Sequence, residues 1–145
     1  MDIILRKTAL SDIKDIKKLF SFYCLETENV EKSLSECITA TLDERIVGCA
    51  CLSAGNIVEL RSIAVLPNYR NMGIGSKLVD AILKRAIDIS DKVYLRTTSP
   101  AFFEKKGFRK LSHDMKKSIW KDCAECDKFN ICKQTLMGLS IEKIK

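Results

Sequence analysis

Residues 63–78 read IAVLPNYRNMGIGSKL, and they say more about the fold than any other part of the chain. The apolar start predicts the end of a strand at Pro67, and a helix is expected directly after Gly75. Glycines let backbone amides approach a ligand, and a helix N-terminus adds N–H groups and a positive dipole end. With Arg70 at its edge, this loop is typical of a phosphate or pyrophosphate site. A tight turn without a ligand explains the glycines equally well.

Two other phosphate-binding motifs do not match the spacing. A Walker A loop needs four residues between its first glycine and Gly-Lys, and Gly75-Ser76-Lys77 lacks that arrangement. A dinucleotide fingerprint needs a small third residue where this chain has Leu78. That fingerprint also follows the first strand of its fold, whereas several predicted strands come earlier here.

The rest of the chain is expected to form strands first and strand–helix units later. The predicted strands are Ile3–Thr8, Ile38–Leu42, Ile46–Ala54, Ile57–Leu66, Lys92–Thr98, Phe108–Leu111 and Gln134–Ile141. Apolar residues at helical spacing between Ile13 and Tyr23 predict a helix with Ser11 as its N-cap, and Pro100 is expected to begin a short helix over Ala101–Lys106. This order predicts a mixed sheet with helices on both faces.

Three segments in the same order carry a family resemblance. They are ELRSIAVLPNYR at 59–70, RNMGIG at 70–75 and PAFFEKKGF at 100–108. They resemble the pantetheine-binding strand, the R/Q-x-x-G-x-G/A pyrophosphate loop and the Gly-Phe strand entry of the GNAT superfamily of acyl-CoA-dependent N-acetyltransferases, most closely its N-acetylglutamate-synthase-related branch. The resemblance covers residues 3 to about 112 and implies the α/β (α+β) class, with a mostly antiparallel sheet of about six to seven strands. The length of the chain and the lack of a dividing linker favour one domain over residues 1–145.

The resemblance also implies acetyl-CoA as cosubstrate. The implied binding residues are Ile63, Ala64 and Val65 on the strand and Arg70, Asn71, Met72, Gly73, Ile74, Gly75 and Ser76 in the loop. Because the donors in such a loop are mainly backbone amides, a Cβ added at either glycine is expected to weaken CoA binding while the fold survives.

Acetyl transfer to an amine needs a group that removes a proton from the ammonium form. Glu59 matches the position of the family's carboxylate base, although a strand glutamate that is exposed or salt-bridged explains it equally well. Arg61, two residues further, is expected on the same side of the strand, where it could pair with Glu59 or bind an acceptor carboxylate. Arg96 is a second candidate for binding that carboxylate.

The general acid departs from the family pattern. Many members place a tyrosine in the short helix, and its counterpart here is Phe103, which has no proton to donate. Tyr94, Ser99 or water could substitute.

The seven cysteines fall into two groups. Cys123, Cys126 and Cys132, in a loop over 120–133, predict a Zn²⁺ or iron–sulfur site whose fourth ligand could be His113, Asp127, Cys37 or a non-protein group. A reducible disulfide or unligated thiols are the alternatives. Cys24, Cys37, Cys49 and Cys51 are expected to be buried packing residues.

Composition limits the choice of partner without deciding it. The 145 residues contain 25 Lys plus Arg against 19 Asp plus Glu, which gives a net charge of +6 that CoA could partly balance. No apolar run is long enough for a membrane span and no signal-peptide pattern is present, so a cytoplasmic protein is expected, with homodimerisation left open. Nucleic-acid binding would use Lys105, Lys106, Arg109, Lys110, Lys116 and Lys117, which we expect to form a solvated basic face instead.

The expected function is acetyl transfer to an amino acid such as glutamate, with a peptide acceptor or a non-catalytic CoA- and metal-binding sensor as alternatives.

Overall fold

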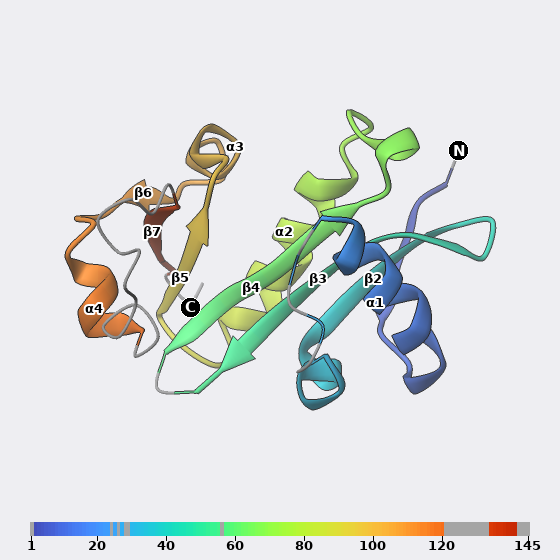
Figure 1. Ribbon diagram of the computed structural model, residues 1–145, viewed down its shortest axis with the longest axis horizontal. Helices are drawn as coiled ribbons and strands as arrows, with labels where there is room; N and C mark the ends of the chain where they lie inside the picture. The colour runs from blue at the N-terminus through green and yellow to red at the C-terminus, as the bar shows by residue number, and fades with distance from the viewer. Residues whose placement is uncertain are drawn as a thin grey trace.

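The computed structural model describes residues 2–23, 25, 27, 30–55, 57–120 and 134–141. Within these ranges, seven strands form one sheet in the order β1-β2-β3-β4-β5-β7-β6 (Figure 1). The strands are β1 (Ile4–Lys7), β2 (Cys37–Leu42), β3 (Arg45–Ala54), β4 (Val58–Val65), β5 (Lys92–Thr97), β6 (Arg109–Lys110) and β7 (Thr135–Ser140). Every neighbouring pair is antiparallel except β4 and β5, which are parallel. The predicted mixed, mostly antiparallel sheet is confirmed.

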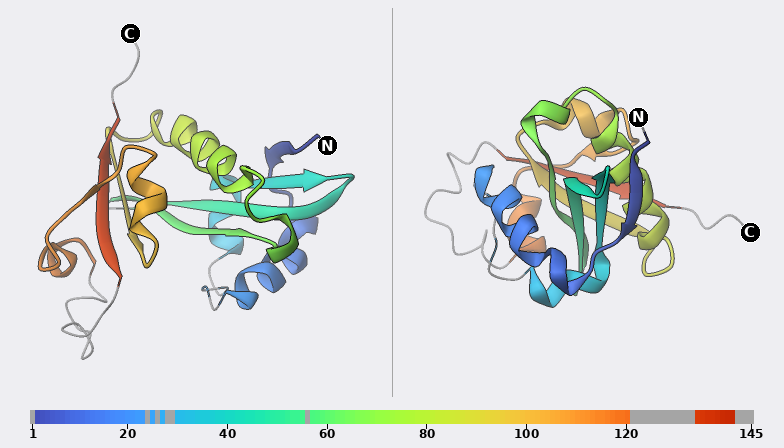
Figure 2. Two further views of the ribbon diagram at one scale, coloured as in Figure 1. Left: turned by 90° about the horizontal axis from the view of Figure 1, so that it is seen from above. Right: turned by 90° about the vertical axis from the view of Figure 1, so that its right-hand side faces the viewer.

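Helices cover both faces of this sheet, as predicted (Figure 2). They are α1 (Ile13–Phe22), α2 (Ile74–Ala86), α3 (Pro100–Glu104) and α4 (Met115–Ile119), with 3-10 turns η1 (Leu10–Asp12), η2 (Glu31–Glu36) and η3 (Pro67–Tyr69). The sequence did not predict α4, which has only five residues. In the part of the chain that the structure describes, no helix has the length and apolar character needed to cross a bilayer.

Side-chain alternation along β3 separates two apolar cores. Ala50 and Leu52 pack in the larger core with residues of α2, whereas Cys49 and Cys51 pack in the smaller core beneath α1. Gly48 lets α2 approach the sheet, since a Cβ there would lie 3.1 Å from Leu78 Cδ1 and 3.2 Å from the Ala64 carbonyl oxygen. This close packing fixes the distance between α2 and the centre of the sheet.

The start of α1 differs from the sequence prediction. Asp12, not Ser11, is the N-cap residue of α1, and its Oδ2 accepts a hydrogen bond from the Ala9 amide, at 2.7 Å, before the helix begins. The Arg6 guanidinium also binds both Asp12 carboxylate oxygens, at 2.6 and 2.9 Å, and these bonds lower the Asp12 pKa below its usual value. The prediction for Ser11 is wrong because the η1 turn occupies Leu10–Asp12, so α1 begins at Ile13 with Asp12 as its N-cap.

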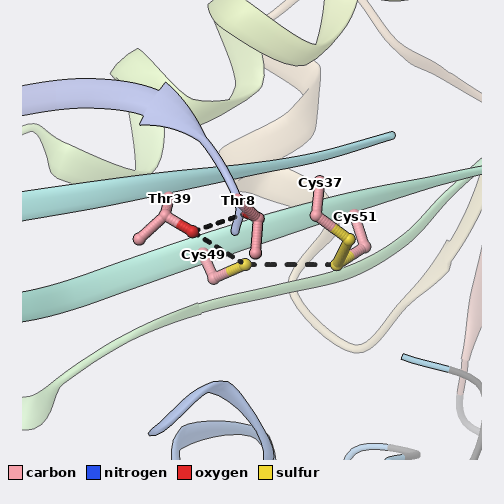
Figure 3. Close-up of a disulfide and its surroundings, with 5 residues drawn as sticks. All are labelled: Thr8, Cys37, Thr39, Cys49 and Cys51. Carbon is pink, nitrogen blue, oxygen red and sulfur yellow. Dashed lines mark hydrogen bonds between the residues drawn. A yellow bond between two sulfur atoms is a disulfide. The ribbon is translucent and has the colours of Figure 1, made fainter. Parts of the chain in front are cut away.

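Two of the four cysteines expected to be simple packing residues are bonded to each other. Cys37 and Cys51 occupy directly opposite positions in β2 and β3, with Cα atoms 4.1 Å apart, and form a disulfide (Figure 3). Cys49 is buried as predicted, with its Sγ 4.0 Å from that of Cys51 and 4.0 Å from the Thr39 hydroxyl oxygen. Strand spacing placed Cys49 and Cys51 on one face, but only the β2–β3 register reveals that Cys37 faces Cys51.

Burial raises the pKa of the Cys49 thiol to about 12, because the anion would lose its hydration. Stability linked to this protonation is fully present below the thiol's ordinary value of 9.0 and is lost as pH rises toward about 12. At pH 8, Cys49 is therefore a thiol, which is a poor nucleophile toward the neighbouring disulfide.

We expect native protein treated with iodoacetamide at pH 8 to keep Cys49 unmodified and to yield a Cys37–Cys51-linked peptide on non-reducing digestion. The reagent should modify all three residues after reduction in denaturant. Reduction should also lower the free energy of unfolding by about 3 kcal/mol, since the bond closes a loop with a sequence separation of 14. Recovery of Cys37 as a free thiol from the native protein would contradict the assignment.

Candidate functional site

The glycine loop joins the end of β4 to the start of α2. Pro67 begins the η3 turn, Asn71 has a left-handed φ of 66°, and Gly73 has a φ of 78° as the N-cap of α2. Asparagine tolerates the left-handed region and glycine enters it without strain, so both residues suit this path. The first amides of α2 then form an anion-attracting helix end directly after the strand. The loop and helix predicted from the glycines are both present, but the helix begins at Ile74, so Gly75 lies in its first turn and not before it.

The two phenylalanines of α3 have different surroundings. Phe103, which the sequence predicts to replace a tyrosine, is buried in the larger core, where its ring contacts Phe108 at a centroid distance of 5.8 Å. Phe102 is partly exposed, and its Cζ would lie 3.4 Å from a Cβ added at Gly75. Phe102 therefore lies beside the start of α2, a position that sequence reasoning did not assign to it.

Strands β4 and β5 diverge toward their C-terminal ends (Figure 1). Glu59 and Tyr94 form the one registered pair between them among the described residues. Further along β4, the Leu66 amide donates to the Val47 carbonyl at 2.8 Å, and hydrogen-bonding alternates along an antiparallel ladder. Val65 therefore directs its own N–H and C=O away from β3, toward the side where β5 has moved away. A ligand with amide groups could pair with this edge.

Glu59 lies where the two strands begin to part, and its side chain is 7% exposed. Arg96 on β5 places Nη2 3.5 Å from Glu59 Oε2, and its guanidinium carbon lies 4.3 Å from the centroid of the Trp120 ring. Arg96 thus lies between a carboxylate and an aromatic face, which fixes it more firmly than either contact alone. The sequence left open whether Glu59 is a base or a salt-bridged strand residue, and the contact with Arg96 is such a salt bridge. Sequence reasoning missed Trp120, because only the fold brings it to β5.

A bulge in β4 changes the expected position of Arg61. Cys51 pairs with Ser62 and Leu52 with Leu60, so Arg61 has no residue opposite it on β3. Glu59 and Ser62 then share a face at a spacing of three residues, and the simple alternation that placed Arg61 beside Glu59 does not hold. Arg61 is exposed, and bulges of this kind often re-aim a side chain next to a functional site.

A cavity of about 520 Å³ lies on β5, β6, β7 and α4, and none of the expected CoA residues lines it. Its lining includes Tyr94, the strand partner of Glu59, together with Lys92, Arg109 and Ser140. One lining residue of the cavity is thus the strand partner of Glu59, and none belongs to the glycine loop.

The predicted metal ligands Cys123, Cys126 and Cys132, with Asp127, lie outside the described residues. Within the described ranges, no group of three or more His, Cys, Asp or Glu side chains could hold a metal ion. Cys37 is not a fourth ligand, because its sulfur is bonded to Cys51.

The expected basic face is only partly solvated. Lys116 is 0% exposed, so the prediction that it lies on a solvated surface is wrong. Lys106 contacts Asp80 Oδ1 at 2.9 Å, and Lys110 approaches Glu104 Oε1 at 3.6 Å. These contacts draw part of the positive charge into intramolecular pairs.

Comparison with known proteins shows the family of this chain. The acetyltransferase (GNAT) domain family matches residues 33–110, more than half of the chain, and the match includes β4, the glycine loop, α2 and α3. The chain belongs to the GNAT acetyltransferase family.

The names of its curated relatives agree with N-acetyltransferase activity. An uncharacterized N-acetyltransferase of Chlorobaculum tepidum is 27% identical over 149 residues, covering 94% of this chain and 95% of the relative. An amino-acid acetyltransferase of Mycobacterium tuberculosis is 29% identical over 121 residues, covering 74% and 69%.

Solved structures agree with the GNAT fold. N-acetylglutamate synthase from Neisseria gonorrhoeae, complexed with coenzyme A and N-acetyl-glutamate, matches with a TM-score of 0.82 at 22% identity. That match covers 99% of this chain and 36% of the synthase chain. This chain therefore has the fold of one part of the longer synthase. A Mycobacterium tuberculosis protein solved with CoA matches with a TM-score of 0.80 at 25% identity, covering 96% and 99% of the two chains. The predicted resemblance to this branch of the GNAT family is confirmed.

The open space around Gly73 allows a charge test of the loop. A Cβ at Gly73 would meet no atom within 4 Å, and both Asn and Asp tolerate a left-handed φ. We expect Gly73→Asp to weaken CoA binding by about 10-fold or more relative to Gly73→Asn, because the two side chains match in size and differ in charge. Isothermal titration calorimetry with CoA measures both affinities. Equal affinity of the two variants would contradict an anion site at this helix end.

Proposed function

We propose that this GNAT protein transfers the acetyl group of acetyl-CoA to the primary amine of an amino acid such as glutamate. The observation that carries the proposal is the buried Glu59, which lies beside Arg96 where β4 and β5 begin to part. The amino-acid acetyltransferase relative and the synthase solved with CoA and N-acetyl-glutamate support the choice of substrate. The proposal treats residues 1–145 as a single cytoplasmic domain with a Cys-containing loop over 120–133. Homodimerisation stays a prediction.

Two parts of the chain would hold the cosubstrate. The β4 edge from Ile63 to Val65 would meet the pantetheine arm as a further strand would. Ile63 and Val65 direct their backbone groups toward the arm, whereas Ala64, between them, directs its own toward Cys49 of β3. The loop from Arg70 to Ser76, including Asn71, Met72, Gly73, Ile74 and Gly75, offers amides and one guanidinium to the pyrophosphate. Acetyl-CoA supplies the activated acetyl thioester, and the residues of this chain hold and orient it.

Glu59 would take the proton from the acceptor's ammonium group, directly or through water. The amine nitrogen then bonds to the acetyl carbon as the carbon–sulfur bond breaks. The nitrogen gives up a second proton to water and the released thiolate takes up one, which leaves a neutral amide and the thiol of CoA. Phe103 cannot supply that proton, so Tyr94, Ser99 or water would do so. A thiolate is a tolerable leaving group, so the reaction does not depend on a strong general acid.

Arg61 and Arg96 would bind the acceptor's carboxylate groups. Guanidinium groups pair with carboxylates in a bidentate geometry, which orients an amino acid and not only attracts it. Arg96 already contacts Glu59 and Trp120, so a carboxylate bound there would share its guanidinium with the proposed base. Binding of the acceptor is therefore expected to influence the group that deprotonates it.

The proposal assigns Cys123, Cys126 and Cys132 to a Zn²⁺ or iron–sulfur site that fastens the C-terminal segment. Anaerobically purified protein is then expected to carry about one metal site per chain, which Cys132→Ser should lose. Metal analysis together with the visible absorption spectrum distinguishes zinc from an iron–sulfur cluster. A metal-free and fully active preparation would count against the site.

The catalytic proposal is tested by CoA release from acetyl-CoA with a panel of amino acids and peptides. We expect turnover with an amino acid such as glutamate, and Glu59→Gln should reduce kcat by about 100-fold or more because the amine loses its base. Glu44→Gln is the matched control, since Glu44 lies exposed in the β2–β3 turn. Turnover with peptides alone would favour the peptide acetyltransferase. Tight CoA binding without turnover of any amine would favour the non-catalytic sensor.

A further inference from the structure

Tyr23 connects the end of α1 to the end of β4. Its hydroxyl donates a hydrogen bond to the Val65 carbonyl oxygen at 2.5 Å, across 42 positions of sequence. The helix end that carries Tyr23 is itself closed by hydrogen bonds from the Tyr23 and Leu25 amides to the Phe20 carbonyl, at 3.1 and 2.9 Å. The Tyr23 side chain therefore starts from a hydrogen-bonded turn, and its hydroxyl reaches the edge of β4 that faces away from β3.

The same ring also contacts the glycine loop. The Arg70 guanidinium carbon lies 6.0 Å from the centroid of the Tyr23 ring, within the range of a cation–π contact. The backbone amide of Arg70 donates to the Pro67 carbonyl at 3.3 Å, which anchors the main chain of this residue in the η3 turn. One side chain thus touches both elements expected to hold CoA, the β4 edge at its hydroxyl and the loop at its ring.

We propose that Tyr23 is a positioning residue for CoA, an inference that rests on the proposed use of this cosubstrate. Its hydroxyl fixes the direction of the Val65 carbonyl, and its ring limits the positions open to the Arg70 side chain. A carbonyl oxygen has two lone pairs, so the bond from Tyr23 leaves one for a ligand amide. Groups that are already ordered lose less conformational entropy when the ligand arrives, so affinity rises without a direct contact.

Two substitutions separate the roles of the hydroxyl and the ring. Tyr23→Phe keeps the ring and should raise the CoA dissociation constant and the KM for acetyl-CoA about 3- to 10-fold, with kcat changed less than about two-fold. Tyr23→Leu removes both contacts and should raise the dissociation constant further. Arg70→Ala should cost less affinity in the Tyr23→Leu background than in the wild type, because the two residues act together.

Tyr69→Phe is the matched control. Tyr69 lies on η3 beside the same loop, but its ring faces the Arg45 guanidinium, whose carbon lies 6.0 Å from the ring centroid. Removing the Tyr69 hydroxyl should leave the affinity for CoA unchanged. Thermal unfolding of every variant identifies a purely structural effect.

Isothermal titration calorimetry with CoA and steady-state kinetics with acetyl-CoA decide the matter. If the wild type binds CoA and Tyr23→Phe binds it equally well, the positioning role is overturned and the proposed function stands. A lower Tm with an unchanged dissociation constant overturns it in the same way. Failure of the wild type to bind CoA overturns the proposed function, and the positioning role with it.

Discussion

The separation of β4 from β5 after the Glu59–Tyr94 pair is the constraint on which the rest of the site depends. Backbone N–H and C=O groups that lose a strand partner must find water, a side chain or a ligand, because leaving them unpaired costs free energy. Tyr23 meets part of this need at Val65, and the remaining edge is open to an extended ligand with amide groups. Since β4 leads through η3 directly into α2, the same opening ends at a helix N-terminus that favours an anion.

Much of the fold could be predicted because it depends on local patterns. Alternating apolar and polar residues predicted the strands to within a few residues of their observed bounds. Pro67 and Gly73 predicted where β4 ends and α2 begins. Predictions failed where tertiary contacts decide. The N-cap of α1 is Asp12, which pairs with Arg6 of β1, and α4 is too short for its periodicity to be recognised. The Cys37–Cys51 bond follows from strand register, which one sequence does not specify.

The site was predictable at its main-chain part and less so at its side chains. The glycine loop needs particular residues at particular spacings, so its signal is local and strong. The residues around Glu59 are not close to it in sequence. Arg96 comes from the neighbouring strand, and the Trp120 ring, which follows α4, packs against the Arg96 guanidinium. A bulge also moves Arg61 out of simple alternation. Tyr23 carries no motif at all, because its role depends on where α1 ends relative to β4. Residues that act across the fold become visible only when the fold is known.

The central claim is that acetyl-CoA binds along the open edge of β4 and ends at the start of α2. Amide hydrogen exchange followed by mass spectrometry, with and without acetyl-CoA, tests it most directly. The account predicts slower exchange in peptides covering β4 and residues 70–78, with little change in the β1–β2 pair on the far side of the sheet. Protection confined to the peptides around Lys92, Arg109 and Ser140, which line the separate cavity, would contradict it. So would the absence of any protection at saturating acetyl-CoA.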